Sequence, residues 1–136
     1  MKGKRDAAMK KLLVLDDDID LLDVLQMAFS DAGYHTKCVS KVDDIVGLVR
    51  SFSPDVLLVD LMLNGVDGGH LCAYLKGQPE TKHLPIIIFT AGQNPSWRAG
   101  SFGCDEFIYK PFDLFELISK ISLHSDRLVS SSCVEL

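Results

Sequence analysis

The sequence predicts an α/β fold in which helices cover both faces of a doubly wound parallel sheet. Two observations carry this prediction: short apolar runs recur along the chain, and most are followed by apolar residues at helical spacing. The runs are too short for helices and rich in branched residues, which is typical of strands buried on both faces. Alternation of strand and helix indicates this architecture, because right-handed crossovers place helices on both sides of the sheet.

Five segments are expected to form the strands. Four are apolar runs, and the fifth alternates polar and apolar residues, as an edge strand does. The apolar runs are Leu12–Leu15, Val56–Val59, Ile86–Phe89 and Phe107–Tyr109, and the alternating segment is His35–Val39. A five-stranded sheet follows, with residues 35–39 in its weakest strand.

Four apolar stripes predict amphipathic helices between and after the strands. Their members are Ile19, Leu22, Leu25 and Phe29; Val42, Ile45, Val46 and Val49; Leu71, Cys72 and Leu75; and Leu114, Leu117, Ile118 and Ile121. Asp18 or Asp20 is expected to cap or charge the first helix. A further helix is expected between the third and the last of these stripes, at residues 93–102, and it is the fourth helix along the chain. Because this segment contains Pro95 and Gly100 and few apolar residues, the fourth helix is expected to be short or mobile.

The composition and the net charge limit which kinds of protein this chain can be and which partners it can bind. With 136 residues, 47% hydrophobic and 24% charged, the chain is expected to fold as one globular domain. The 14 basic and 19 acidic residues give a net charge of −5, which argues against direct binding to nucleic acid or to an anionic membrane. No apolar run is long enough to span a membrane. The four cysteines form no CxxC pair, which favours reduced thiols in a cytoplasmic protein.

We expect three parts along the chain: a flexible extension at residues 1–9, a folded domain at 10–124 and a flexible tail at 125–136. The first strand begins just after the extension, and the last apolar stripe ends before the polar, serine-rich tail. About a dozen residues remain after that stripe, too few for an output domain.

Polar side chains follow four of the predicted strands, at the edge where parallel sheets bind ligands. Asp16 and Asp17 follow the first strand, and Asp60, Thr90 and Lys110 each follow a later one. Three neighbouring carboxylates repel one another, which raises a pKa or requires a cation. Mg²⁺, or Mn²⁺ in its place, is the complement we expect, since it accepts a few carboxylates and keeps waters for a phosphoryl group. A carboxylate beside such a cation can act as a nucleophile and form an aspartyl phosphate.

These residues lie in four segments that together resemble the receiver domain of two-component response regulators, over about residues 10–124. The segments are VLDDDIDLL at 14–22, PDVLLVDLMLNGVDG at 54–68, PIIIFTA at 85–91 and GCDEFIYKPF at 103–112. The resemblance implies a flavodoxin-like fold whose five strands lie in the order 2-1-3-4-5.

The resemblance also implies how a metal ion would be held. Asp60 matches the phosphoacceptor of the family. Asp17 matches the carboxylate that binds the metal directly, and Asp16 matches the one that acts largely through water. Met62 matches the position whose backbone carbonyl completes the metal shell.

A second group of residues matches the switch of the family. Thr90 matches the hydroxyl that moves toward the phosphoryl group, and Lys110 matches the lysine that pairs with that group. The bond between Lys110 and Pro111 matches a peptide bond that is cis in the family. Phe107 matches the aromatic residue that turns inward on activation.

By this resemblance the chain is a stand-alone phosphoacceptor rather than an enzyme, although it assists its own phosphotransfer and dephosphorylation. The implied donor is a histidine kinase or phosphotransfer protein, and the implied output is a downstream protein partner. The protein is expected to be a monomer or a phosphorylation-dependent dimer.

Two departures from the family pattern keep an alternative open. Asn64 stands where Pro is usual, although Asn64-Gly65 is still a good turn dipeptide. The stretch from Thr90 to Phe107 is also slightly shorter than usual, which affects the fourth helix. A non-phosphorylated interaction module with the same fold is therefore the alternative.

Two rival functions on related sheets fit the sequence less well. Phosphohydrolases with an aspartate nucleophile use a second Asp two residues later, where this chain has Met62. A flavodoxin-like cofactor binder needs a phosphate-cradling loop after the first strand, and the first strand here is followed by three aspartates.

Overall fold

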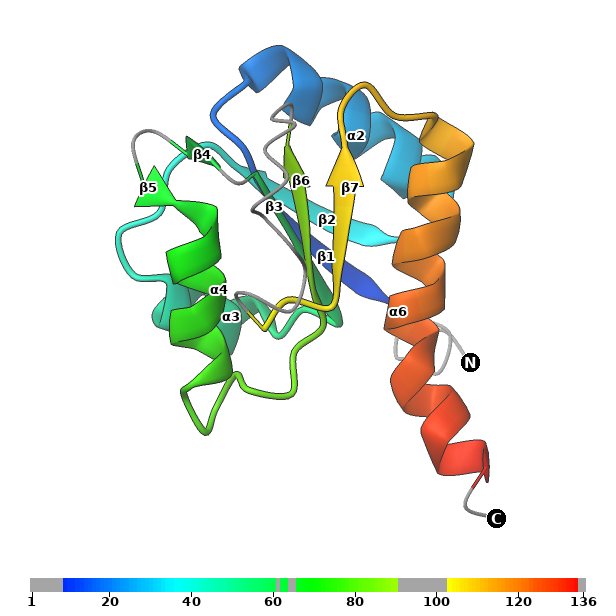
Figure 1. The fold of residues 1–136 in the computed structure, drawn as a ribbon. Helices are drawn as coiled ribbons and strands as arrows, with labels where there is room; N and C mark the ends of the chain where they lie inside the picture. The colour runs from blue at the N-terminus through cyan, green and yellow to red at the C-terminus, as the bar shows by residue number, and fades with distance from the viewer. Residues whose placement is uncertain (1–8, 61, 64–65, 91–102, 135–136) are drawn as a thin grey trace.

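The computed structural model describes residues 9–60, 62–63, 66–90 and 103–134 (Figure 1). Its main sheet consists of β1 (Lys11–Leu15), β2 (His35–Val39), β3 (Val56–Asp60), β6 (Ile86–Thr90) and β7 (Glu106–Tyr109). The strands lie in the order β2-β1-β3-β6-β7, and all neighbours are parallel. Counted along the chain, this is the expected order 2-1-3-4-5, with residues 35–39 at an edge.

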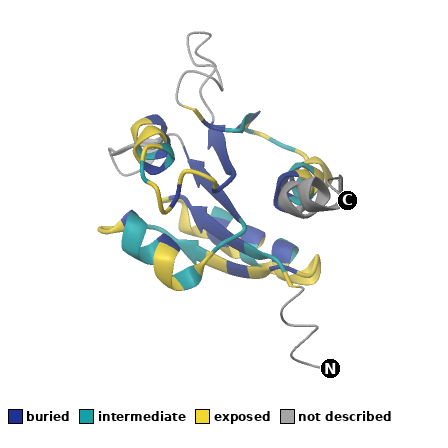
Figure 2. Cartoon of the chain, turned by 90° about the horizontal axis from the view of Figure 1, so that it is seen from below, coloured by how far each residue is buried: buried dark blue, intermediate teal, exposed yellow. Residues whose placement is uncertain are grey.

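The two faces of the sheet support two separate cores, because successive side chains of a strand point to opposite faces. Leu13 and Leu57 belong to one core, whereas Leu12 and Leu58 belong to the other. The central strands β3 and β6 are buried along their whole length. Figure 2 shows the sheet as a dark blue layer between the helices.

Within the described part of the chain, two helices cover each face of the sheet (Figure 1). One core contains side chains of α3 (Ile45–Phe52) and α4 (Gly68–Lys76), and the other contains those of α2 (Ile19–Asp31) and α6 (Leu114–Val134). The four helical stripes predicted from the sequence all fall on these helices or their margins. The predicted α/β fold with helices on both faces is confirmed.

Aspartate side chains set the starts of two helices. Asp18 caps α2 by accepting a hydrogen bond of 3.2 Å from the backbone N–H of Leu21. Asp44 caps α3 in the same way, with 3.0 Å to the N–H of Gly47. The second predicted stripe therefore began too early, because Val42 lies before the cap. Its side chain still packs against the core beneath α3.

The last helix is longer than the sequence suggested. Residues 125–136 were expected to form a flexible tail, but α6 continues to Val134. Ser125 is buried, and its hydroxyl shares a hydrogen bond of 3.2 Å with the hydroxyl of Tyr34. No Gly or Pro interrupts residues 114–134, so nothing in the backbone ends the helix at residue 124. The folded domain thus includes Ser125.

Other predicted features fall partly or wholly outside the described residues. The expected extension at residues 1–9 is described only at Met9. The fourth helix of the series, at residues 93–102, is not among the described residues. The turn expected at residues 64–65 lies between β4 (Met62–Leu63) and β5 (Val66–Asp67), which pair as a short antiparallel hairpin.

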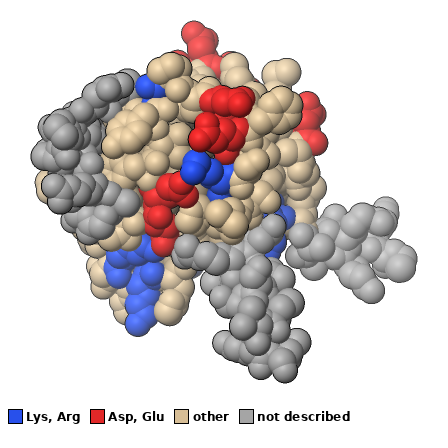
Figure 3. All heavy atoms as spheres, turned by 45° about the vertical axis from the view of Figure 1, so that its right-hand side comes forward, with Lys and Arg blue, Asp and Glu red and all other residues tan. Residues whose placement is uncertain are grey.

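The surface carries charges of both signs. On the face that Figure 3 presents, acidic and basic side chains lie in small groups, and some of opposite sign are neighbours. The net charge of −5 is therefore not gathered into one patch on this face. Among the described helices, none combines the length and the apolar character needed to cross a membrane.

Candidate functional site

The carboxyl ends of the parallel strands bring the five predicted site residues to one edge of the sheet. Asp60 and Thr90 are the last residues of β3 and β6, and Asp16 and Lys110 directly follow β1 and β7. Asp17 comes next along the chain. Because the strands are parallel and in register, residues from four separate segments meet at this edge.

The three aspartates form a compact group of carboxylates. One oxygen from each of Asp16, Asp17 and Asp60 lies within 4.8 Å of the other two. Asp16 and Asp60 are buried, and Asp17 is exposed. Hard divalent cations such as Mg²⁺ prefer this all-oxygen donor set, and the exposed side of the group leaves room for water ligands. The residues present therefore fit a divalent cation.

Asp16 is held in place by its neighbours. Its Oδ1 accepts a hydrogen bond of 2.9 Å from the backbone N–H of Asp18. Its Oδ2 accepts one of 3.0 Å from Nζ of Lys110. The backbone N–H of Asp16 donates to the carbonyl of Val39, at the end of β2. Both carboxylate oxygens of this buried residue thus have partners, which offsets the cost of burying its charge.

Lys110 supplies positive charge beside two of the three carboxylates, those of Asp16 and Asp60. Its Nζ lies 3.0 Å from Oδ2 of Asp16 and 3.6 Å from Oδ1 of Asp60. The same ammonium lies 4.5 Å from the centroid of the Phe89 ring, a favourable cation–π distance. The backbone N–H of Lys110 donates to the carbonyl of Thr90 at 2.8 Å, which fixes the end of β7 beside β6.

The environment of Asp60 favours its protonated form. Burial raises the pKa of its carboxyl from 3.8 to about 6, and the charges of Asp16 and Asp17 add to this effect. The ammonium of Lys110 opposes the rise without cancelling it. Three acidic groups with one nearby ammonium leave an excess of negative charge, which a proton or a cation can balance.

The remaining predicted residues lie around this group. Thr90 is buried at the end of β6. Phe107 lies in β7, half-buried, with its ring packed against the core beneath α3 and α4. Met62 is the first residue of β4, two positions after Asp60. The peptide bond between Lys110 and Pro111 is cis, as expected. The roles assigned to Thr90, Phe107 and Met62 stay predictions.

The sequence did not single out two residues that shape the site. Phe89 was assigned to the core, yet its ring lies against the ammonium of Lys110. Asp18 was expected only to cap α2, yet its N–H also orients Asp16. An aromatic residue directly before the polar end of a central strand is the signal that could have identified Phe89.

Comparisons with known proteins agree with this geometry. The profile of the family described as "Response regulator receiver domain" matches residues 12–122. The chain is 29% identical to the N-terminal domain of the nisin resistance regulator NsrR, a lantibiotic response regulator; the match covers 85% of this chain and 97% of that one, with a TM-score of 0.73.

Two further solved structures are similar. The receiver domain of the Francisella response regulator 1452 is 26% identical, over 88% of this chain and 98% of that one, with a TM-score of 0.78. A CheY-like response regulator receiver domain from Methanospirillum hungatei JF-1 is 21% identical, over 91% of this chain and 99% of that one, with a TM-score of 0.81, and supports the fold alone. Because the family profile matches most of the chain, the chain belongs to the response regulator receiver domain family.

Proposed function

We propose that this protein is a phosphoacceptor of a two-component signalling system. Asp60 accepts a phosphoryl group from the phosphohistidine of a histidine kinase or phosphotransfer protein, with Mg²⁺ or Mn²⁺ bound beside it. One observation carries the proposal: three carboxylate oxygens lie within 4.8 Å of one another, and Nζ of Lys110 lies 3.6 Å from Asp60. A cation site beside a nucleophile and a lysine is what phosphoryl transfer requires.

The cation would be held by Asp16, Asp17 and Asp60, with the backbone carbonyl of Met62 as a further ligand. When bound, it supplies positive charge that screens the carboxylates from the incoming phosphoryl group. Asp16 is already oriented for this role by its hydrogen bonds to Asp18 and Lys110.

The chain's own residues carry the transfer. A carboxylate oxygen of Asp60 attacks phosphorus, and the bond between phosphorus and the donor's imidazole nitrogen breaks. The attack needs ionised Asp60, which in the metal-free protein is the dominant form above a pH of about 6. Lys110 then pairs with a phosphoryl oxygen, and the hydroxyl of Thr90 donates a hydrogen bond to another.

The phosphoryl group changes the local charge and thereby biases a two-state element. Thr90 moves toward the phosphoryl group, and the ring of Phe107, half-buried here, turns further inward. The surface changed by these movements of Thr90 and Phe107 then binds a downstream protein partner or a second copy of the chain. We place this signalling in the cytoplasm, and we regard the chain as an acceptor rather than an enzyme with a separate substrate.

Intact-protein mass spectrometry after incubation with acetyl phosphate and Mg²⁺ tests the proposal. We expect one adduct of about 80 Da in the wild type, none in Asp60→Asn and an undiminished adduct in Asp31→Asn. Asp31 is a matched control because it is exposed at the last residue of α2. An adduct that persists in Asp60→Asn would contradict the proposal. Absence of both the adduct and Mg²⁺ binding would favour the interaction module.

A further inference from the structure

Three contacts hold the ammonium of Lys110 at the edge of the sheet, and one of them is aromatic. Its Nζ lies 3.0 Å from Oδ2 of Asp16 and 3.6 Å from Oδ1 of Asp60. It also lies over the ring of Phe89, 4.5 Å from the centroid. The face of an aromatic ring attracts a cation, most strongly where water is excluded. Phe89 is fully buried and only 21% of the Lys110 side chain is exposed, so this contact is well shielded from water.

The register of the sheet places the ring beside the proposed phosphoacceptor. Phe89 and Asp60 are register partners on the parallel strands β6 and β3. Side chains of such partners leave the sheet on the same face, and Phe89 belongs to the core beneath α2 and α6. The ammonium of Lys110 therefore reaches the carboxylate and the ring from one position.

The same ring also contacts the turn that carries Lys110. Its centroid lies 5.9 Å from that of the Phe112 ring, with 37° between the two planes. Phe112 follows Lys110 by two residues and packs against the same core. Phe89 thus contacts this turn twice, at the ammonium of Lys110 and at the ring of Phe112.

The ring is the contact that a bound divalent cation leaves unchanged. Asp16 and Asp60 are also the proposed ligands of that cation, so their attraction for the ammonium weakens when their charge is shared with it. The Lys110 side chain is long and rotates freely, and part of it faces solvent. Without the ring, the ammonium would spend more of its time turned toward water.

We propose that Phe89 is a positioning residue for phosphoryl transfer, which holds the ammonium of Lys110 where it pairs with the incoming phosphoryl group. The inference rests on the proposed phosphoacceptor function and extends it to a residue that carries no charge and no ligand atom. Removing the ring lowers the fraction of molecules whose ammonium is in place, and the rate of transfer falls with that fraction.

The initial rate of adduct formation with acetyl phosphate and Mg²⁺, followed by intact mass, tests the proposal. Phe89→Leu and Phe89→Met fill the position with an apolar side chain but remove the ring. We expect each to lower the rate about fivefold, which corresponds to about 1 kcal/mol. Phe89→Tyr keeps the ring face and should stay within about twofold of the wild type, although burying its hydroxyl costs stability. Rate and stability should therefore change separately.

Nuclear magnetic resonance of the Lys110 side chain gives a readout that needs no phosphorylation. Protons held over the face of an aromatic ring resonate upfield. The ε-methylene protons of Lys110 should therefore be shifted upfield in the wild type and in Phe89→Tyr. The upfield shift should disappear in Phe89→Leu, whereas a residue that only stabilises the core would leave it unchanged.

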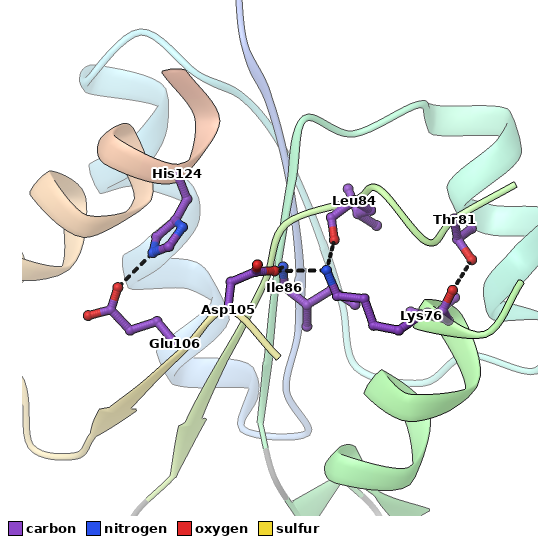
Figure 4. Close-up of polar contacts among 8 residues, drawn as sticks. Lys76, Thr81, Leu84, Ile86, Asp105, Glu106 and His124 are labelled. Carbon is purple, nitrogen blue, oxygen red and sulfur yellow. Dashed lines mark hydrogen bonds and ion pairs between the residues drawn. The ribbon is translucent and has the colours of Figure 1, made fainter. Parts of the chain in front are cut away.

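Two control variants separate positioning from loss of stability. Phe29→Leu removes another fully buried ring of the same core, near the end of α2, whereas the site lies beside the start of that helix. Asp105→Asn breaks an ion pair at the opposite end of β6. There Oδ2 of Asp105 lies 2.9 Å from Nζ of Lys76 and accepts a hydrogen bond of 2.7 Å from the N–H of Ile86 (Figure 4). Both variants should lower the unfolding free energy and leave the adduct rate of the folded protein unchanged.

The outcomes distinguish this inference from the function on which it rests. A wild type that forms no adduct would contradict the proposed function, and the inference with it. If the wild type forms the adduct but Phe89→Leu and Phe89→Met form it equally fast, the positioning role alone is overturned. An equal loss of rate in Phe29→Leu would also overturn it, as would Lys110 protons that resonate at the same position with and without the ring.

Discussion

Replacing Asp60 with Asn should stabilise the metal-free protein. The carboxyl of Asp60 is buried beside two other carboxylates, so its ionised form is disfavoured in the folded state. Asn has nearly the same size and shape but no charge at any pH. The substitution therefore removes the electrostatic cost of the site while keeping its packing.

The size of the effect follows from the pKa of Asp60. Folding raises this pKa from 3.8 to about 6, which corresponds to about 3 kcal/mol at about 1.4 kcal/mol for each pKa unit. This value already includes the opposing attraction of Lys110. Because the folded state holds the proton more tightly than the unfolded state, the wild type loses stability as pH rises from about 4 through about 6. The advantage of Asp60→Asn is therefore small at pH 4 and complete above about pH 7.

Urea denaturation in the presence of a chelator, at pH 5 and pH 8, measures this advantage. We expect the difference in unfolding free energy between Asp60→Asn and the wild type to grow by roughly 1 kcal/mol between the two pH values. Asp31→Asn should show no such growth. Adding Mg²⁺ at pH 8 should then stabilise the wild type and not Asp60→Asn. An advantage of equal size at both pH values would refute the reasoning.

Three further predictions concern ion pairs and the core, and each is checked by denaturation of the variant beside the wild type. Lys110→Met removes the ammonium 3.0 Å from Asp16; it should lower the unfolding free energy by roughly 1 to 3 kcal/mol and reduce the acetyl phosphate adduct. Burial tends to raise the pKa of Glu106, but hydrogen bonds to basic side chains of α6 outweigh it and lower the pKa. Glu106→Gln should therefore cost about 1 to 2 kcal/mol at pH 7, and this loss should disappear as the pH falls through the lowered pKa of Glu106. Phe29→Ala empties a fully buried position and should cost about 3 to 5 kcal/mol at any pH between 5 and 8.

The sheet and its site could be predicted because the sequence carries a local signal for each. Branched apolar runs mark the central strands, and in each the first polar residue marks the carboxyl end. Asp60 and Thr90 were identified this way without any contact being known. Parallel pairing then brings such residues together whatever the lengths of the connections between them.

Other features depend on contacts between residues far apart in the chain. The burial of Ser125, the first residue of the expected tail, involves a hydrogen bond with Tyr34, 91 positions away. The contact between Phe89 and Lys110 joins the ends of two neighbouring strands, and the aromatic residue directly before Thr90 is its one signal in the sequence. The start of α3 was misplaced because an apolar stripe does not show at which residue the N-terminal cap begins the helix.

The central claim is that Asp60 is the residue that accepts the phosphoryl group, and chemical trapping tests it most directly. Borohydride reduces an acyl phosphate, which converts a phosphorylated aspartate to homoserine. After reaction with acetyl phosphate and Mg²⁺, the peptide 51–76 contains three aspartates: Asp55, Asp60 and Asp67. Sequencing of this peptide by mass spectrometry should find homoserine at position 60 alone. Homoserine at position 55 or 67, or in none of the peptides, would contradict the account.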